Sequence, residues 1–253
     1  MARIIGIINQ KGGVGKTTSS LNIAAYLAAL GKYVLLVDLD PQANSTSGVG
    51  VKMEDDHPHI YHAMVDGIHP RAAIKKSPLF GLDIMPSGES LAGANIELVG
   101  VQNREYKLRE ALEAVRIQYD YILIDSPPSL GLLTVNGLAA SEEIIIPVQC
   151  EYYALEGLSQ LIKTVDLVKT SLNSELKIMG VLLTMYDKRN RLDRQVVKEV
   201  KRNFPGRVFD AVIPRSISLA EAPSFGQTIL QFDPGSKAAK SYRRLAEEII
   251  SLS

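Results

Sequence analysis

The sequence predicts an α/β fold with a mainly parallel, twisted sheet and helices on both faces, arranged as a three-layer α/β/α sandwich. Short apolar runs alternate along the chain with stretches in which apolar residues recur at helical spacing. The runs are continuously apolar, which is typical of strands buried on both sides. Strands and helices that alternate in this way form right-handed crossovers and a parallel sheet.

Length and composition favour a single domain over residues 1–253. The chain is 46% hydrophobic, ample for a sizeable core, and no internal repeat or low-complexity linker marks a second domain. It has no apolar run of membrane-spanning length and no signal-type N-terminus, so we expect a cytoplasmic protein. The one cysteine, Cys150, lies beside an apolar run and is expected to be a small buried residue.

Charge is balanced overall but unevenly distributed. The 28 basic and 28 acidic residues give a formal net charge of zero, so the whole molecule has no electrostatic bias toward nucleic acid. Residues 186–253 carry 13 Lys and Arg against 8 Asp and Glu, which leaves 15 against 20 for residues 1–185. An anionic polymer would therefore prefer the C-terminal third of the chain.

A phosphate-binding loop follows the first apolar run, Ile4 to Ile8. Its glycines let backbone N–H groups turn inward around a polyphosphate, and the next helix presents its positive N-terminus. Lys16 adds a positive charge, and Thr17 offers a hydroxyl to Mg²⁺. The candidate binding residues are Lys11, Gly12, Gly13, Val14, Gly15, Lys16, Thr17 and Thr18.

The loop departs from the usual motif at its first glycine position, which holds Gln10. The chain instead has a second lysine, Lys11, at the loop entrance, where Lys16 and the loop amides already neutralise one polyphosphate. A glycine-rich turn with two solvated lysines is the plainer interpretation. The strand before the loop and the helix after it argue against that interpretation.

The second apolar run, Tyr33 to Val37, leads into two acidic residues. Asp38 and Asp40 lie two positions apart, so both point to one face if the strand geometry continues, and Pro41 ends the strand. Carboxylates at the carboxyl end of a parallel strand lie at the ligand edge of the sheet. There they could hold Mg²⁺ waters or position an attacking water; the alternative is a well-capped turn.

Residues 43–86 carry weaker signals and contain all four histidines of the chain. The histidine spacing fits no compact zinc pattern and no cysteine lies nearby, so we expect a solvated loop and a short helix. A short strand at 82–86 and two helices, at 89–100 and 103–118, are predicted to follow.

The apolar run from Tyr121 to Ile124 is followed by Asp125 and two prolines. An aspartate at such a strand end orients Mg²⁺ in proteins with a phosphate-binding loop. Many buried strands also end in aspartate, so the assignment of Asp125 as a metal residue depends on the upstream loop. Two more strands, at 143–148 and 178–184, flank a long helix.

Cations are concentrated in residues 186–194, which lead into a further helix with a buried-type apolar stripe. Such residues could contact phosphates without reading bases, although a solvated helix face is the usual meaning of this pattern. The candidate nucleic-acid-binding residues are Lys188, Arg189, Arg191, Arg194, Lys201, Arg202 and Arg215.

The chain is expected to close with a short strand at 212–216 and an amphipathic helix at 236–251. An amphipathic helix of this kind could bind a membrane surface. Its polar side carries both Glu247 and Glu248 among the cations, and the helix lacks Trp or Phe anchors, so we expect it to dock on the core.

Three segments together resemble the deviant Walker A ATPases, and most closely the ParA/Soj chromosome-partitioning branch. They are residues 11–18, 37–42 and 124–129, and the similarity continues through 149–157 and 213–224. The resemblance implies a P-loop NTPase fold, ATP and Mg²⁺ as cofactors, and slow hydrolysis stimulated by a ParB-type centromere-binding protein. It also implies an ATP-dependent homodimer on nonspecific double-stranded DNA, nucleoid-associated and without stable membrane association.

The resemblance gives three residues catalytic roles. Lys11 is similar to the family's signature lysine, which reaches the partner's phosphates across an ATP-sandwich dimer. Lys16 would bind the β- and γ-phosphates, and Asp40 would position the hydrolytic water. ATP then becomes part of the dimer interface, and hydrolysis becomes the step that releases it.

The same resemblance implies a metal site and a base site. Thr17 would bind Mg²⁺ directly and Asp125 through water, while Asp38 would support the metal shell and the switch loop. Pro214 and Ser216 align with the loop that contacts adenine in this family.

Three other classes share the phosphate-loop pattern. A MinD-like ATPase that positions the division site from the membrane surface is the alternative function, and the closing helix discriminates it. An electron-transfer protein such as the nitrogenase iron protein needs cluster cysteines, which one cysteine cannot supply. An amide ligase on this scaffold would need a substrate pocket that the sequence does not reveal.

Overall fold

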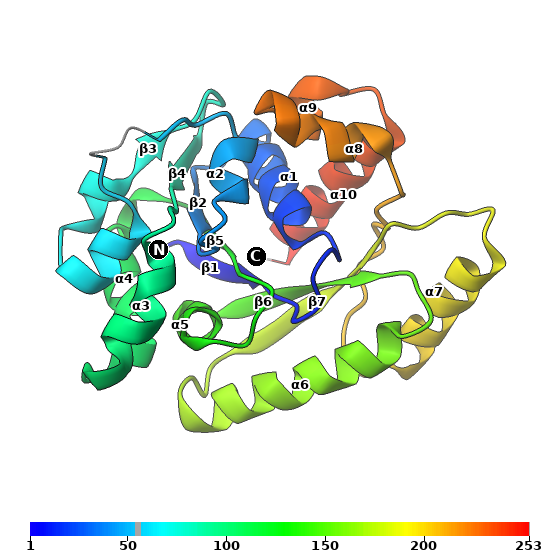
Figure 1. The fold of residues 1–253 in the computed structure, drawn as a ribbon. Helices are drawn as coiled ribbons and strands as arrows, with labels where there is room; N and C mark the ends of the chain where they lie inside the picture. Colours follow the sequence, from blue (N-terminus) through cyan, green and yellow to red (C-terminus); the bar gives the residue numbers. More distant parts are fainter. Residues whose placement is uncertain (54–56, 253) are drawn as a thin grey trace.

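The computed structural model describes residues 1–53 and 57–252. Within them, one sheet has the strand order β3-β4-β2-β5-β1-β6-β7, and only the edge pair β3–β4 is antiparallel (Figure 1). The mainly parallel sheet expected from the apolar runs is confirmed. The strands are β1 Arg3–Ile7, β2 Val34–Asp38, β3 Lys75–Lys76, β4 Leu82–Met85, β5 Tyr121–Asp125, β6 Glu143–Gln149 and β7 Lys177–Thr184.

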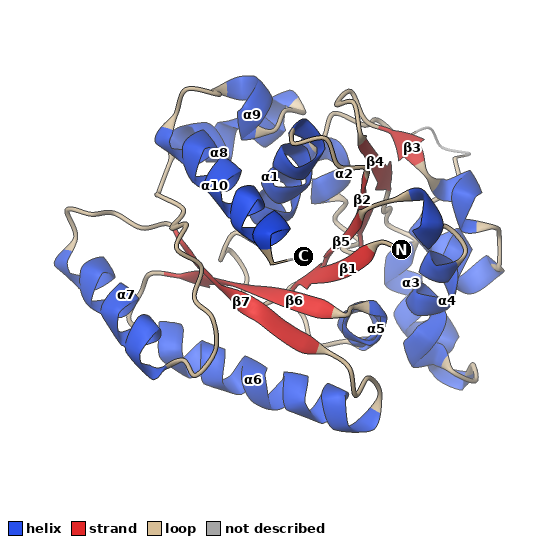
Figure 2. Cartoon of the chain, turned by 180° about the vertical axis from the view of Figure 1, so that it is seen from behind, coloured by secondary structure: helices blue, strands red, loops and turns tan. Residues whose placement is uncertain are grey.

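Helices cover both faces of this sheet, which confirms the three-layer arrangement. Helices α1, α9 and α10 pack on one face, and α3 to α7 pack on the other (Figures 1 and 2). The helices are α1 Lys16–Ala29, α2 Asn44–Gly48, α3 Leu91–Glu97, α4 Lys107–Glu113, α5 Leu132–Ala140, α6 Ala154–Ser171, α7 Arg191–Asn203, α8 Ile217–Glu221, α9 Ile229–Phe232 and α10 Lys237–Ser251.

Strand side chains alternate between two buried layers. In β1, Ile5 and Ile7 pack in the cluster formed with α1 and α10, whereas Ile4 packs in the cluster formed with α3, α4 and α5. Successive side chains of a strand point to opposite faces. Because both faces are covered, most strand positions favour apolar residues, and this explains the continuous apolar runs.

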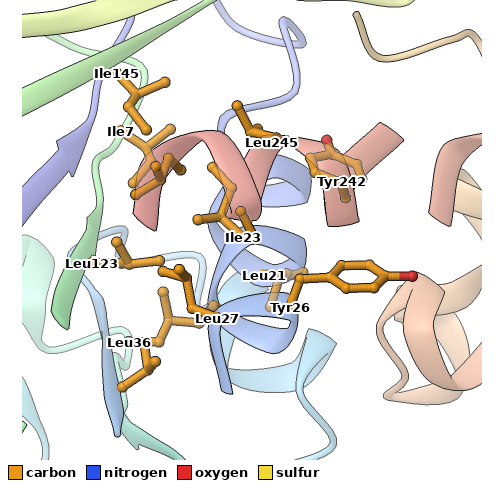
Figure 3. Packing of buried hydrophobic residues seen from close by; sticks show 14 of the residues in the cluster. Ile7, Leu21, Ile23, Tyr26, Leu27, Leu36, Leu123, Ile145, Tyr242 and Leu245 are labelled. Carbon is orange, nitrogen blue, oxygen red and sulfur yellow. The ribbon is translucent and has the colours of Figure 1, made fainter. Parts of the chain in front are cut away.

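The closing helix α10 docks on the core, as predicted. Its apolar stripe packs against α1 and the sheet, where Tyr242 and Leu245 lie near Ile23 (Figure 3). The buried Tyr242 hydroxyl lies 3.1 Å from the hydroxyl of Ser19 on α1. Among the described residues, no helix combines the length and apolarity that crossing a membrane requires.

The helices predicted at 89–100 and 103–118 form in interrupted pieces. Helix α3 continues into a 3₁₀ turn, Leu98–Gly100, and α4 is flanked by the 3₁₀ turns Arg104–Tyr106 and Arg116–Gln118. Between the two sets, Asn103 has a left-handed backbone with φ of 57°. A residue in this conformation cannot continue a right-handed helix.

The strand predicted at 212–216 is wrong. This segment forms only an isolated parallel bridge between Pro214 and Tyr186, beyond the end of β7. Proline has no N–H to donate, so a regular ladder does not propagate through it. The segment nevertheless runs beside the Met185 to Asp187 loop, and this places it near the phosphate-binding loop.

The histidine segment contains a π-helical turn, His62–Asp66, and a 3₁₀ turn, Pro70–Ala73, so its expected helical part is short. His59 is buried, with its Nε2 atom 2.9 Å from the Ser90 hydroxyl. The part of the chain that the structure describes contains no group of three or more His, Cys, Asp or Glu side chains placed to hold a metal ion.

Candidate nucleotide site

The phosphate-binding loop connects β1 to α1 at the carboxyl end of the sheet. Gly13 and Gly15 have left-handed backbones, with φ of 74° and 89°. Glycine adopts this conformation without the steric cost that other residues have. A Cβ atom added at Gly12 or Gly13 would meet nothing within 4 Å, so the loop is open on the side where a phosphate would enter.

Side chains from neighbouring strands anchor this loop. The Thr184 hydroxyl, at the end of β7, donates to the Val14 carbonyl over 2.8 Å. Asn9 donates to the Pro147 carbonyl over 2.7 Å and accepts from the Lys11 amide over 3.0 Å. The loop is therefore held from β6 and β7, which lie on one side of β1.

Helix α1 begins at Lys16 without a side-chain cap and without an acidic residue in its first turn. Its first N–H groups are thus available to an anion, and the helix dipole favours negative charge there. Lys16 is buried, and its ammonium donates to the Lys11 carbonyl over 3.1 Å. Burial lowers the pKa of Lys16, while Asp125 and Asp40 partly oppose that shift.

Asp38 and Asp125 are register partners at the carboxyl ends of the adjacent strands β2 and β5. Both carboxylates are fully buried. Burial is the main cause that raises the pKa of each group, and for Asp38 the nearby Asp125 adds to the rise, to about 7. Two buried carboxylates beside an anion-binding loop favour a cation between them and the phosphates.

Asp125 accepts hydrogen bonds from hydroxyl groups of two helices. The Ser20 hydroxyl on α1 lies 3.0 Å from one carboxylate oxygen, and the Ser45 hydroxyl on α2 lies 2.7 Å from the other. The Thr17 hydroxyl also hydrogen-bonds Asp125. Oxygen ligands of this kind suit Mg²⁺, so the residues at the end of β5 fit the expected metal.

Asp38 uses both carboxylate oxygens within the protein. One oxygen accepts from the amide and the hydroxyl of Thr46, over 2.8 and 2.7 Å, and the other accepts from the Asp40 amide over 3.2 Å. Asp38 therefore holds the loop that carries Asp40. This geometry agrees better with support of the loop than with direct ligation of a metal.

Asp40 lines an open cavity of about 340 Å³ together with the phosphate-binding loop. Its side chain is partly exposed and accepts from the Gln42 amide over 3.0 Å. The cavity thus brings together Lys16, Thr17 and Asp40, which the sequence placed in two separate motifs. Lys11 is not among the residues that line it.

A smaller cavity of about 180 Å³ adjoins the first and is mainly apolar. Gly15, Thr18 and Met185 line both cavities, and Pro214 and Ser216 line only the smaller one. The mainly apolar cavity is therefore continuous with the cavity beside the phosphate-binding loop. Met185 has φ of 55°, an uncommon backbone for a residue other than glycine, and such strain is typical of functional sites.

Lys11 lies at the loop entrance and pairs with Glu151, which precedes α6. The lysine side chain is 49% exposed, so it is accessible from outside the chain. Lys11 and Lys16 consequently differ in environment: one is held at the surface by a carboxylate, and the other is buried in the loop.

The predicted basic residues are all exposed. On α7, at about 100° per residue, Arg191, Arg194, Lys198, Lys201 and Arg202 fall on one side, opposite the buried apolar residues. We call these five residues the basic face. Lys188, Arg189 and Arg215 lie on adjacent loops, and Arg189 pairs with Asp187 over 2.8 Å.

The loop between β7 and α7 links the basic face to the smaller cavity. Tyr186 accepts from the Arg215 amide over 3.1 Å and donates its own amide to the Ile213 carbonyl over 3.0 Å. Ile213, Met185 and Arg215 line the cavity. The loop between β7 and α7 therefore borders the candidate base site at Met185 and leads into the basic face.

Several residues of this site were not predicted from the sequence, among them Thr184, Ser20, Ser45, Thr46 and Glu151. A hydroxyl residue in a loop or helix carries no distinctive pattern, because most such residues only cap or face solvent. The one available signal was position, since Ser45 and Thr46 lie on α2, directly after the loop that carries Asp40.

The fold and the site together define a P-loop nucleotide-binding protein. A family model described as an AAA domain matches residues 2–178. The chain is 55% identical to the sporulation initiation inhibitor protein Soj of Bacillus subtilis strain 168, over 98% of each chain. It is 49% identical to the chromosome partitioning protein ParA of Myxococcus xanthus strain DK1622, over 99% of this chain and 88% of that protein.

Solved structures of P-loop proteins are also similar to this chain in fold and in sequence. Cobyrinic acid a,c-diamide synthase from Mycobacterium smegmatis, with bound ATP analog and magnesium, is 35% identical with a TM-score of 0.87, over 99% of this chain and 95% of that one. The cell division ATPase MinD of Pyrococcus furiosus is 27% identical with a TM-score of 0.84, over 100% of both chains. The chain belongs to the ParA/Soj family of chromosome-partitioning ATPases, within the MinD/ParA group of P-loop NTPases.

Proposed function

We propose that this protein is an ATP-driven switch for chromosome partitioning, in which an ATP-sandwich homodimer binds DNA without sequence preference and hydrolysis releases it. The observation that carries the proposal is the segment from Met185 to Arg194. It borders the nucleotide cavities at one end and begins the basic face at the other. A change at the nucleotide therefore has a short path to the surface that would contact DNA.

In this proposal the phosphate-binding loop and Lys16 hold the β- and γ-phosphates, and Pro214 and Ser216 contact the adenine. Thr17 and Asp125 would hold Mg²⁺, with Asp38 supporting the shell. When bound, Mg²⁺ supplies neutralisation of the phosphate charge. Asp40 orients the attacking water, because it is the partly exposed carboxylate in the phosphate cavity.

Lys11 acts between subunits. Its exposed ammonium is free to rotate away from Glu151, since surface ion pairs of this kind contribute little energy. A cation at the loop entrance is most useful against the phosphates of a second nucleotide. This supports ATP as part of the dimer interface. From membership of the ParA/Soj family, we propose that a ParB-type protein is the partner that accelerates hydrolysis.

DNA binding follows from the basic face. Each phosphate that a lysine or arginine neutralises releases counterions, so binding is salt-dependent and needs no base contacts. Pairing two chains doubles the number of these contacts, which makes affinity depend on dimerisation. Arg189 and the residues of the basic face are exposed. Their exposure supports nonspecific DNA binding by this protein and, with it, association with the nucleoid.

The test is duplex DNA binding by the full chain with ATP and with ADP, measured by fluorescence anisotropy at several salt concentrations. We expect a complex with ATP that weakens steeply with salt and little binding with ADP. Asp40→Ala should retain ATP-dependent dimers and stop hydrolysis. Equal DNA affinity with both nucleotides, or full turnover by Asp40→Ala, would contradict the proposal.

The MinD-like alternative requires a surface that binds membrane. In α10, the apolar residues Tyr242, Leu245 and Ile249 are used in core packing, and the exposed positions are mostly charged. A helix whose apolar side is already covered cannot insert into a bilayer without undocking. Co-sedimentation with anionic vesicles and ATP decides between the two functions, and strong vesicle binding would favour the alternative.

A further inference from the structure

Thr46 lies at a junction between two adjacent strands, although it belongs to neither. Its hydroxyl donates to Asp38, at the end of β2, over 2.7 Å, and accepts from the Ser87 amide over 3.1 Å. Ser87 follows the end of β4, which pairs with β2. One buried hydroxyl thus uses its donor and an acceptor at the same time.

The second oxygen of Asp38 continues this series of hydrogen bonds. It accepts from the backbone amide of Asp40 over 3.2 Å. A connected path therefore runs from the Ser87 amide through the Thr46 hydroxyl and the Asp38 carboxylate to the backbone of Asp40. Each link lies on the protein interior side of the loop, and Asp40 lies on the cavity side.

The loop that carries Asp40 has a backbone that needs such support. Ala43 has φ of 53°, a left-handed conformation that is sterically unfavourable for a residue with a Cβ atom. The Ala43 amide donates to the Asp40 carbonyl over 2.9 Å, which closes a tight turn directly before α2. A strained turn persists only where the surrounding contacts hold it.

We propose that Thr46 is a positioning residue for ATP hydrolysis, acting through Asp38 on the backbone of Asp40. This inference rests on the proposed function, in which Asp40 orients the attacking water. Thr46 lines neither nucleotide cavity, so it has no direct contact to offer the nucleotide. Its effect should therefore fall on the hydrolysis rate and spare the affinity for ATP.

The hydroxyl, not the bulk of the side chain, carries this role. Valine has nearly the same shape but neither donates to Asp38 nor accepts from Ser87. Serine keeps both hydrogen bonds and loses only a methyl group. Misplacement of a water-orienting carboxylate by a fraction of an ångström is enough to slow a reaction strongly.

The experiment compares four variants of the full chain: Thr46→Val, Thr46→Ala, Thr46→Ser and Ser47→Ala. Ser47 is the matched control, because it is an exposed residue on the same short helix whose hydroxyl donates to the Ala43 and Asn44 carbonyls and not to Asp38. Single-turnover hydrolysis gives the rate, and titration with a fluorescent ATP analogue gives the affinity. Thermal unfolding identifies any variant that fails to fold, in which case Thr46→Ala replaces Thr46→Val.

We expect Thr46→Val and Thr46→Ala to lower the hydrolysis rate by about ten-fold or more, with affinity for the analogue changed by less than about three-fold. Thr46→Ser and Ser47→Ala should stay within about two-fold of the original chain in both measurements. An unchanged rate in Thr46→Val or Thr46→Ala, an equal loss in Thr46→Ser, or a parallel loss of affinity would overturn the inference.

Asp40→Ala, measured in the same series, separates this inference from the proposed function. If Asp40→Ala is inactive and Thr46→Val is fully active, only the role of Thr46 fails. If Asp40→Ala hydrolyses ATP normally, the assignment of Asp40 fails first, and the role of Thr46 fails with it.

Discussion

Lys11 and Glu151 form an ion pair within one chain, at the entrance of the phosphate-binding loop. Both side chains are partly exposed, so the pair adds little to folding stability. The pair matters because, in the proposed function, Lys11 contacts a nucleotide that is bound by another subunit. An intrachain carboxylate competes with that contact and makes association weaker than it would otherwise be.

Replacement of Glu151 by glutamine is expected to strengthen ATP-dependent dimerisation by up to about five-fold for each of the two Lys11–Glu151 pairs in the dimer, because a surface ion pair is worth about 1 kcal/mol or less. Sedimentation equilibrium with a slowly hydrolysed ATP analogue measures the dissociation constant. Glu156→Gln is the control, since Glu156 is an exposed glutamate on the first turn of α6 and is not the partner of Lys11. Unchanged or weaker association in Glu151→Gln would show that the pair does not restrain Lys11.

Replacement of Lys201 by alanine should weaken DNA binding and reduce its salt dependence. Each lost phosphate contact lowers the slope of log affinity against log salt by about 0.9, and a dimer loses two contacts, or about 1.8. Titrations between low and moderate salt give the slope. Lys240→Ala, an exposed lysine on α10, should leave the slope unchanged. Equal slopes for Lys201→Ala and the original chain would show that Lys201 does not contact DNA phosphates.

The buried imidazole of His59 should make the free energy of unfolding depend on pH in the acidic range. Burial lowers the pKa of His59 to about 4, from 6.5 in the unfolded chain, and His62 and His57 contribute. Between these values the unfolded chain binds a proton that the folded chain does not, so the contribution of His59 is present above pH 6.5 and is lost as pH falls toward 4. Urea unfolding of His59→Gln should show a shallower loss over this range, whereas parallel curves would contradict the assignment.

The buried contact between Tyr242 and Ser19 should be detectable in a double-mutant cycle. Tyr242→Phe and Ser19→Ala are each expected to lower the free energy of unfolding by about 1 kcal/mol, because each removes the same hydrogen bond. The double variant should then cost less than the sum of the two single changes. Additive losses measured by urea unfolding would mean that the two hydroxyls do not interact.

Most of the fold could be predicted from the sequence, because its strands are buried on both faces and their apolar runs are unmistakable. The edge strand β3 could not, since Lys75–Lys76 is too short and too polar to leave a pattern. The strand prediction around Pro214 was wrong for a different reason. Its apolar composition predicts a strand, but the missing N–H of proline limits it to a single bridge.

The site was predictable in part. Phosphate-loop and strand-end residues occupy fixed positions within motifs, so Lys16, Asp40 and Asp125 could be named before their surroundings were known. The hydroxyl residues that hold the carboxylates, such as Ser45 and Thr46, could not be named, because their partners lie on other elements and are brought close only by folding. The same holds for the pairing of Lys11 with Glu151.

The docking of α10 has a consequence for synthesis of the protein. Tyr242 lines the smaller cavity from α10, whereas Gly15, which also lines it, belongs to the phosphate-binding loop near the start of the chain. A growing chain on the ribosome has its phosphate loop early but lacks this wall until Tyr242 has emerged. Chains released before that point lack part of this wall, so the two regions must fold together before the smaller cavity is complete.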